Sequence, residues 1–397
     1  MAGGFSKGRL GRMSEVLLGY ADRGEVPGLV GLVARGDSVH VVAAGVQDRQ
    51  SRTPMQRDTI FRIASMTKPV VAAAAMILVE ETKLRLDEPV DRLLPELADR
   101  RVLRTLGSEI DDTVPANRPM MLRDLLTFRC GFGAVIARPG TYPIQRAMAD
   151  AGFAPGPIPS ALTPDAWIAE FARLPLIHQP GDAWHYHTGS DILAVLVARA
   201  AGMSLPDFMA ERIFAPLGMA DTGFHVPPAK LDRLSTSYRF DGNSLVVFDA
   251  ARRGIWSKPP AFASGGGGLV STADDYLAFS RMLLGMGSHG GVRVLSRPSV
   301  ELMTADHLTA EQKAASPFYP GFWDSNGWGF GMAVTTRRDG YLSPGSFGWD
   351  GGFGTSARTD PKEDLITILL TQRTLRSPVP EDIAVDFRTL AYQAIDD

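Results

Sequence analysis

Strand patterns are concentrated at the two ends of this sequence, and a long helix-rich block separates them. Near the N-terminus, the segment VPGLVGLVARGDSVHVVAAGVQD is typical of two valine-rich strands joined by a turn at Gly36-Asp37. Strand patterns return near the C-terminus in GWGFGMAVTT, GSFGWDGG, TSARTDP and DLITILLTQ, and a helix near residues 380–394 follows them. This order predicts one α/β layer built from both termini, which we assign to residues 1–90 and 231–397.

Residues 91–230 form the helix-rich block. Helical apolar spacing occurs in MLRDLLTF, TPDAWIAEFARL, GSDILAVLVARAAG and LPDFMAERIFAPLG, and loops rich in proline and glycine separate these segments. Few strand patterns interrupt them, so we predict a mainly helical domain. Within this block, residues 135–164 are dense in proline and glycine, which favours a loop over a site or an edge rather than core structure.

The composition is that of a globular protein with a substantial core. Of 397 residues, 45% are hydrophobic and 21% are charged, while the net charge is −3 and the pI is about 6.2. Because both signs are scattered along the chain, we expect no surface for nucleic acid or a membrane. The longest apolar run, Val70–Val79, is shorter than the roughly 20 residues that span a bilayer.

Cysteine usage and the N-terminus bear on the compartment and on cofactors. Cys130 is the only cysteine, so no intrachain disulfide, zinc knuckle or Cys-x-x-Cys motif can form. The N-terminal segment is typical of an amphipathic helix rather than a signal peptide, and we therefore expect a cytoplasmic protein. His185 and His187 form a His-x-His pair, but no further ligand cluster completes a metal site, so we predict neither a metal nor another cofactor.

The segment FRIASMTKPVVAAAAMILVE at residues 61–80 carries a serine and a lysine three positions apart, before an alanine-rich helical run. At this spacing Ser65 and Lys68 share one helix face, at the end where backbone N–H groups and the helix dipole favour negative charge. Desolvation would lower the pKa of Lys68, and the pair could then activate the serine as a nucleophile. The same spacing also fits an N-cap serine followed by a solvated lysine.

Two later segments offer the other groups that such chemistry needs. Tyr186, in PGDAWHYHTGSDIL, precedes a predicted helix, where its phenol could reach a serine hydroxyl; a nearby ammonium would lower its pKa and make it a candidate base. The alternative is a tyrosine packed at a loop-to-helix junction. In SFGWDGGFGTSARTDP, closely spaced glycines permit close approach to a strand, so the N–H of Gly352 could bind an oxyanion; the alternative is a glycine bulge.

In chain order, the segments SMTK at 65–68, YHT at 186–188 and WDG at 349–351 resemble the three active-site motifs of the serine β-lactamase and penicillin-binding-protein superfamily. The likeness spans nearly the whole chain and is greatest to family VIII carboxylesterases, which resemble class C β-lactamases. It implies an α/β (α+β) fold of the β-lactamase-like serine hydrolase type. Such a fold has an antiparallel sheet flanked by helices, a mainly helical domain, and the active site between them.

The resemblance also implies an acyl-enzyme mechanism. Ser65 would attack an ester carbonyl while Tyr186 takes its proton in concert with Lys68. The backbone N–H groups of Ser65 and Gly352 would hold the oxyanion, and water activated by Tyr186 would release the acid. We expect six further residues around the substrate, namely Trp349, Asp350, Gly351, His187, Thr188 and Phe353.

Three motif positions depart from the patterns of related enzymes. Trp349 stands where many superfamily members carry Lys or His, a cation that attracts a substrate carboxylate, so an uncharged acyl or alcohol group is favoured. Trp at this place is a feature of the family VIII esterases. Thr188 replaces the asparagine of a Tyr-x-Asn motif, and both changes point away from efficient β-lactam turnover. Asp350 differs from the Trp-Gly-Gly expected in the esterases, and the sequence leaves open whether its carboxylate faces the site.

Several functions stay open at this point. The leading hypothesis is a serine hydrolase that cleaves short-chain acyl esters through Ser65, with a small-molecule ester as its partner. Alternatives on the same fold are an acyltransferase, a weak β-lactamase and a D-amino-acid peptidase. A catalytically dead ligand-binding module is the non-enzyme alternative, against which the intact Ser65, Lys68 and Tyr186 argue. No Gly-x-Ser-x-Gly elbow occurs, which argues against an α/β-hydrolase, and whether the chain forms a homo-oligomer is left open.

Overall fold

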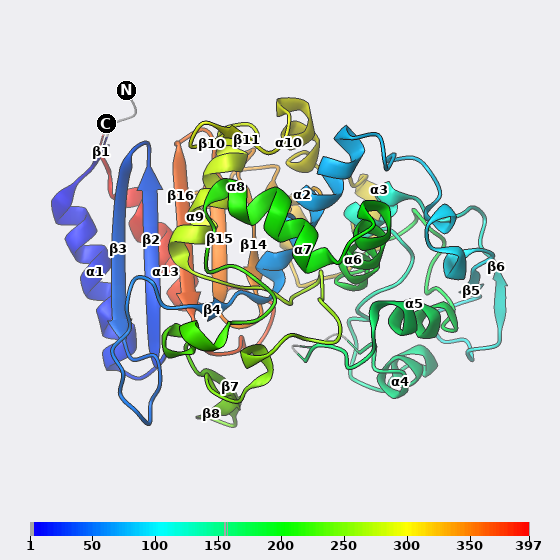
Figure 1. Ribbon diagram of the computed structural model, residues 1–397, viewed down its shortest axis with the longest axis horizontal. Coiled ribbons are helices and arrows are strands. Elements are labelled where there is room, and N and C mark those ends of the chain that lie inside the picture. Colours follow the sequence, from blue (N-terminus) through cyan, green and yellow to red (C-terminus); the bar gives the residue numbers. More distant parts are fainter. Residues whose placement is uncertain (1–3, 155, 157, 397) are drawn as a thin grey trace.

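A seven-stranded antiparallel sheet lies in the left half of the computed structural model in Figure 1, and the structure describes residues 4–154, 156 and 158–396. The N-terminal hairpin joins the C-terminal strands where Leu32 lies opposite Ile368 in antiparallel register. The predicted hairpin and the predicted antiparallel sheet from both termini are therefore confirmed. In spatial order the strands are β12 (Asn326–Trp328), β13 (Ala333–Thr335), β14 (Phe347–Gly351), β15 (Thr355–Asp360), β16 (Leu365–Thr371), β2 (Gly28–Arg35) and β3 (Ser38–Gly45).

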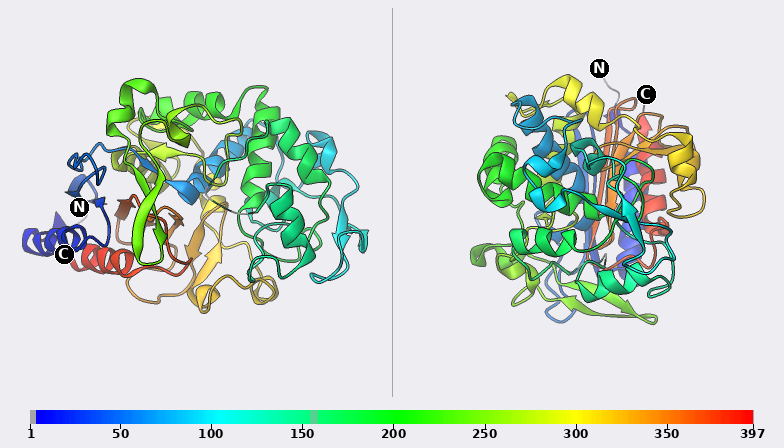
Figure 2. Two further views of the ribbon diagram at one scale, coloured as in Figure 1. Left: turned by 90° about the horizontal axis from the view of Figure 1, so that it is seen from below. Right: turned by 90° about the vertical axis from the view of Figure 1, so that its right-hand side faces the viewer.

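Helices cover both faces of this sheet. On one face, α1 (Lys7–Asp22) and α13 (Asp382–Gln393) pack on each other and share a core that includes Leu17, Leu369 and Phe387. On the other face, α9 (Ala273–Leu284) packs on β15, β16 and β2. Figure 2 shows α1 and α13 side by side at the end of the molecule where the two termini lie. Their apolar stripes are the reason that both terminal helices form against the sheet.

The helix α2 (Thr67–Glu80) is buried from Thr67 to Leu78, as expected for a helix that is apolar all round. It packs against α6 (Thr188–Ala201), the main helix of the block at the other end of the molecule (Figure 1). The two predicted motif-bearing helices therefore lie next to each other. The precise division of the chain at residues 90 and 230 stays a prediction.

The helix-rich block has more structure than the sequence indicated. Besides α6, it contains α3 (Leu122–Leu126), α4 (Pro143–Asp150), α5 (Pro164–Ala172), α7 (Leu205–Met209) and α8 (Ala215–Leu217), with a π-helical turn over Ala210–Phe214. The helix α4 lies inside the segment predicted as a loop, where Ile144 and Met148 bury one face. A small antiparallel pair, β5 (Arg101–Leu103) and β6 (Thr113–Pro115), also lies here.

The remaining elements are short. β1 (Gly4–Phe5) pairs with β17 (Ile395–Asp396), which brings the described ends of the chain together. β4 (Phe61–Arg62) pairs with β9 (Val270–Ser271) just before the Ser65 turn. The other short strands and α-helices are β7 (Ser237–Asp241), β8 (Ser244–Asp249), β10 (Ser288–His289), β11 (Val292–Arg293), α10 (Arg297–Met303), α11 (Ala310–Ala314) and α12 (Phe322–Ser325).

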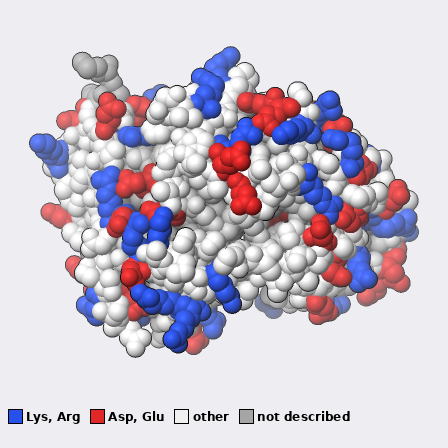
Figure 3. All heavy atoms as spheres, viewed as in Figure 1, with Lys and Arg blue, Asp and Glu red and all other residues white. Residues whose placement is uncertain are grey.

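The surface carries both charge signs, as predicted from the sequence. Figure 3 shows Lys and Arg interspersed with Asp and Glu over the face seen in Figure 1. Within the described part of the chain, no helix alone has the length and hydropathy of a membrane span. One bent pair, Thr188–Ala201 with Leu205–Leu217, meets both criteria only when its two members are taken together.

Candidate active site

Ser65 lies on a tight turn between the short strand β4 and the helix α2. Ala64, immediately before it, has φ 45°, in the left-handed region that residues with a Cβ rarely occupy. A 3₁₀ turn over Ala64–Met66 then leads into α2, so Ser65 precedes the α-helix and Lys68 is in its first turn. The side chains nevertheless meet as the spacing predicts, with Nζ of Lys68 3.1 Å from Oγ of Ser65.

Lys68 is almost completely buried, with 1% of its surface exposed. Its Nζ donates to the carbonyl oxygen of Gly266 and lies 3.3 Å from Nδ1 of His187. Within the described residues, no carboxylate lies within ion-pair distance of this nitrogen. Burial lowers the pKa of Lys68 to about 7, although the charge of Asp191 acts in the opposite direction. The predicted lowering is confirmed, and the amine is substantially neutral near pH 7.

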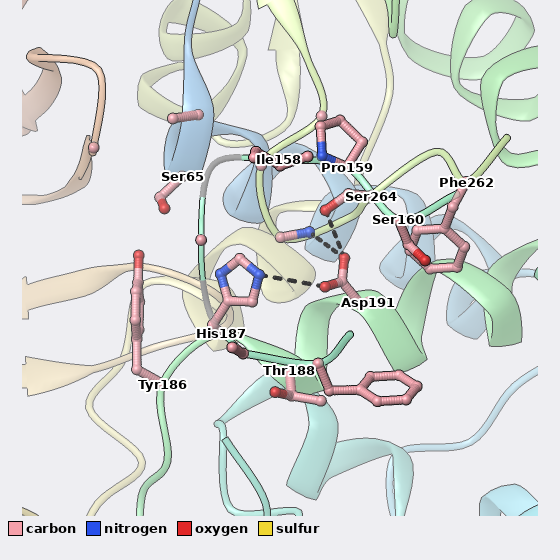
Figure 4. Close-up of a pocket in the computed structure, with 18 of the residues that line it drawn as sticks. Ser65, Ile158, Pro159, Ser160, Tyr186, His187, Thr188, Asp191, Phe262 and Ser264 are labelled. Atoms are coloured by element: carbon pink, nitrogen blue, oxygen red, sulfur yellow. Dashed lines mark hydrogen bonds and ion pairs between the residues drawn. The ribbon is translucent and has the colours of Figure 1, made fainter. Parts of the chain in front are cut away.

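Tyr186 lies two residues before α6, as predicted, and its hydroxyl points toward that of Ser65 in Figure 4. The indole Nε1 of Trp349 donates to the Tyr186 oxygen over 2.6 Å. Burial raises the pKa of Tyr186, and the hydrogen bonds with Ser65 and Trp349 only partly offset this. The expectation that a nearby ammonium lowers this pKa is wrong, because Lys68 is itself desolvated and readily loses its charge.

The third motif lies on β14. Trp349 is buried in an aromatic cluster, and its neighbour Asp350 accepts hydrogen bonds from Ser356 Oγ at 2.6 Å and Arg358 Nη2 at 2.7 Å. The Asp350 carboxylate is therefore bound by two side chains of the neighbouring strand β15. Its side chain also borders a cavity beside Ser65.

Two glycines follow with different surroundings. A Cβ on Gly351 would lie 2.3 Å from the carbonyl oxygen of Ile63, so the strand approaches the Ser65 turn as only glycine permits. Gly352 has open space beside its Cα and borders the cavities on both sides of Ser65. The role of its backbone N–H as an oxyanion donor stays a prediction.

Two cavities meet at Ser65, Tyr186 and Gly352. The first, shown in Figure 4, has a volume of about 400 Å³. Its walls include the predicted His187, Thr188 and Phe353, and also Phe153, Ile158, Trp167 and Phe262. The second cavity has a volume of about 450 Å³ and lies along the third motif. Its walls include the predicted Trp349 and Asp350. Further wall residues are Tyr319, Phe322, Arg358 and Arg388. A molecule that reaches Ser65 therefore has space on both sides.

Sequence reasoning missed Asp191, which contacts His187, and the two groups that donate to Asp191. Nε2 of His187 lies 3.3 Å from Oδ2 of Asp191, while Ser264 Oγ and Gly266 N donate to Oδ1 of Asp191 at 2.7 and 2.9 Å. The glycine run SGGGG at 264–268 was the available signal, because it allows a loop to approach these buried side chains closely.

The His-x-His pair does not act as a unit. Nδ1 of His178 lies 2.7 Å from Nε2 of His185, whereas the His187 ring contacts Lys68 and Asp191. In the part of the chain that the structure describes, no group of three or more His, Cys, Asp or Glu side chains is placed to hold a metal ion.

The antiparallel sheet with its helical block, and a serine, a lysine and a tyrosine gathered between them, define the class of active-site serine enzymes to which β-lactamases and penicillin-binding proteins belong. The chain belongs to the beta-lactamase family, whose model matches residues 14–391.

Individual relatives agree with this assignment. Protein Rv1367c of Mycobacterium tuberculosis (strain ATCC 25618 / H37Rv) is 43% identical over 358 residues, which cover 88% of this chain and 87% of that protein. Esterase EstB of Burkholderia gladioli is 29% identical over 87% of this chain and 85% of its own length. Among solved structures, EstCE1, described as a hydrolase with promiscuous acyltransferase activity, matches with a TM-score of 0.80 and 26% identity, over 97% of this chain and 99% of that chain. These likenesses support a serine hydrolase or acyltransferase.

Proposed function

We propose that this protein is a carboxylesterase of the family VIII type, which hydrolyses small acyl esters through an acyl-enzyme on Ser65. The observation that carries the proposal is the contact between Oγ of Ser65 and a buried lysine whose pKa is lowered to about 7. A neutral amine at this distance can accept the serine proton near neutral pH. The esterase and hydrolase names of EstB and EstCE1 support the same reaction class.

The hydrogen bonds suggest an order of proton transfer. The indole N–H of Trp349 donates to the Tyr186 oxygen, which leaves the Tyr186 O–H free to donate to Oγ of Ser65. When Lys68 is neutral, its Nζ can instead accept from the Ser65 O–H, across the 3.1 Å that separates the two atoms. Lys68 takes this proton as Oγ bonds to the ester carbonyl carbon, and the carbonyl electron pair moves onto oxygen. The backbone N–H groups of Ser65 and Gly352 would hold that oxyanion.

Collapse of the tetrahedral intermediate breaks the bond to the alcohol oxygen. Tyr186, whose raised pKa keeps the phenol protonated, would give its proton to that oxygen and regain one from Lys68. Water then attacks the acyl-enzyme by the same route, and the acid is released with Ser65 restored. No metal or cofactor takes part in this scheme.

The surroundings favour esters over β-lactams. At the start of the third motif, Trp349 offers an indole N–H that already binds Tyr186, rather than a cation for a substrate carboxylate. The first cavity has largely apolar walls and a volume of about 400 Å³, within the usual range for small-molecule sites. We assign the acyl group to this cavity and the alcohol to the second.

Acyl transfer is the second candidate, because the second cavity gives an acceptor alcohol room beside Ser65. EstCE1 is described as having promiscuous acyltransferase activity. Product analysis after adding a primary alcohol to the p-nitrophenyl butyrate assay separates the two candidates. A new butyrate ester identifies transfer, whereas butyric acid alone identifies hydrolysis.

Hydrolysis of p-nitrophenyl acetate and butyrate tests the main proposal. Wild type and the control Ser257→Ala, whose serine is outside both cavities, should turn over, while Ser65→Ala should show only the blank rate. Peptide mass spectrometry after fluorophosphonate treatment should place the adduct on Ser65. Equal rates for wild type and Ser65→Ala, or an adduct elsewhere, would refute the proposal.

A further inference from the structure

The amine of Lys68 also contacts a second group of charged and polar residues, which borders the first cavity. Nδ1 of His187 lies 3.3 Å from Nζ of Lys68. The opposite ring nitrogen lies 3.3 Å from Oδ2 of Asp191, the contact drawn as a dashed line in Figure 4. Asp191 is buried and accepts from Ser264 and from the backbone N–H of Gly266. A continuous line of contacts thus joins a buried carboxylate to the amine beside Ser65.

The backbone is shaped to hold the imidazole in this line. His187 has φ 87°, in the region that glycine favours, and this conformation directs its ring between Lys68 and Asp191. On the other side, a Cβ on Gly266 would lie 2.8 Å from the ring carbon Cε1. The backbone of Gly266 also connects Asp191 to Lys68, because its N–H donates to Asp191 and its carbonyl oxygen accepts from Lys68.

Charge determines which ring nitrogen carries the proton. Burial acts to raise the pKa of Asp191, but hydrogen bonds from His187, Ser264 and Gly266 outweigh it, and the carboxyl stays ionised. Burial, reinforced by the nearby Lys68 charge, lowers the pKa of His187, so the imidazole is neutral. A neutral imidazole beside a carboxylate places its proton on Nε2, which leaves a lone pair on Nδ1 facing Lys68.

A neutral amine has two N–H bonds and one lone pair. At Lys68 the two acceptors for those N–H bonds are the Gly266 carbonyl and Nδ1 of His187. Once both are used, the remaining lone pair faces the third neighbour, Oγ of Ser65 at 3.1 Å. His187 and Gly266 therefore orient the Lys68 amine toward the serine proton, and neither of them accepts that proton.

We propose that His187 and Asp191 are positioning residues for the Ser65 reaction, which direct the Lys68 lone pair to the serine and stabilise the ammonium that forms. This inference rests on the proposed function. When the Ser65 proton reaches Nζ, the ammonium keeps its bonds to His187 and Gly266, and the Asp191 charge stabilises it through the ring. His187 and Asp191 neither gain nor lose a proton in this step.

Among the residues that the structure describes, few other titratable groups lie near the amine. From the segment before α6, Tyr186 places its ring 4.6 Å from Nζ, and Asp350 on β14 acts on the Tyr186 phenol. The glycine loop contributes only Ser264 and backbone groups, and Ser65 itself lies on the turn before α2. Asp191 is therefore the carboxylate whose removal tests the inference most directly.

The test is the pH dependence of kcat/KM for p-nitrophenyl acetate, together with the pH dependence of fluorophosphonate labelling of Ser65. In Asp191→Asn, the amide N–H₂ faces Nε2, so the ring proton shifts to Nδ1 and occupies the Lys68 lone pair. We expect the acid limb to move to lower pH, since a negative charge near the lysine is lost, and the plateau to fall at least about tenfold. Asp275→Asn, a buried carboxylate on α9 outside both cavities, is the matched control and should keep the wild-type profile.

A second variant covers the case in which Asp191→Asn fails to fold. His187→Gly suits the left-handed backbone and leaves a space the size of imidazole. Added imidazole should restore activity in His187→Gly at least about tenfold, but not in His187→Gly/Asp191→Asn, where nothing orients the ring. A structural role alone would predict neither the shifted acid limb nor this difference in rescue.

The two proposals fail in different ways. Wild type without turnover, or with turnover that survives Ser65→Ala, refutes the esterase assignment. An active wild type refutes the positioning role if Asp191→Asn keeps the wild-type acid limb, or if imidazole rescues neither or both of the His187→Gly variants.

Discussion

Burial of Lys68 should make the stability of the folded protein depend on pH in a way that one substitution removes. The ordinary lysine pKa is 10.5, and burial lowers it to about 7 in the folded state. Between these values the unfolded chain binds more protons than the folded protein, so the free energy of unfolding rises with pH. At about 1.4 kcal/mol per pKa unit, the full difference amounts to about 5 kcal/mol.

Lys68→Met keeps an unbranched side chain that is one atom shorter, and it removes the titrating amine. The substitution also leaves the Gly266 carbonyl and the His187 ring without their donor, which costs about 1–3 kcal/mol for each buried group. The stability of the variant at a single pH therefore mixes two effects of opposite sign. The change in stability with pH isolates the first effect, because the lost hydrogen bonds contribute equally at every pH.

Urea unfolding of wild type and Lys68→Met at pH 7, 8 and 9 measures this change. Integration of the proton linkage over that window predicts that wild type gains about 2 kcal/mol more than the variant. Lys313→Met controls for the loss of one lysine, since Lys313 forms a partly exposed ion pair with Asp306 far along the chain. If the free energy of unfolding changes equally with pH in wild type and in Lys68→Met, the folded lysine keeps an ordinary pKa. Lys68 could then not act as a neutral base near pH 7.

Two further predictions concern the third motif. Gly351→Ala should lower kcat/KM roughly a hundredfold, because the new Cβ would displace the Ile63 carbonyl and with it the Ser65 turn; Gly11→Ala, with open space around it, should match wild type in the p-nitrophenyl acetate assay. Trp349→Phe removes the donor to Tyr186, so kcat/KM should fall about three- to tenfold and the alkaline limb of the pH profile should move to higher pH. An alkaline limb that moves to lower pH would contradict the role of the indole N–H.

The strands and the motif-bearing helices were predictable because their signals are local. The valine-rich hairpin and the closing C-terminal strands show their period along the chain, and the apolar run after Lys68 identifies a buried helix. The helix α4 was missed because its two buried residues, Ile144 and Met148, are surrounded by proline and glycine that favour a loop. A short amphipathic helix within such a segment gains its stability from tertiary packing rather than from its own propensity.

The positioning contacts of the site could not be predicted for a different reason. Asp191 occurs in GSDILAVL as an ordinary acidic residue near the start of a helix, and nothing local shows that it is buried. Its partners Ser264 and Gly266 are more than 70 residues away in the chain, so their contact depends on the packing of a loop against α6. The wrong direction for the Tyr186 pKa has the same origin, since the degree of burial is a tertiary property.

The buried lysine connects the stability of this fold to its chemistry. A charged amine inside the apolar surroundings of α2 is unfavourable, and the folded protein lowers that cost by letting the proton dissociate. The same loss of charge creates the lone pair that a serine nucleophile requires. Because two N–H acceptors are already in place at Gly266 and His187, the neutral form is both tolerated and oriented. Any substitution that lets water reach Nζ should therefore stabilise the ammonium and weaken the amine as a base, which makes exclusion of water from this position a requirement of the proposed reaction.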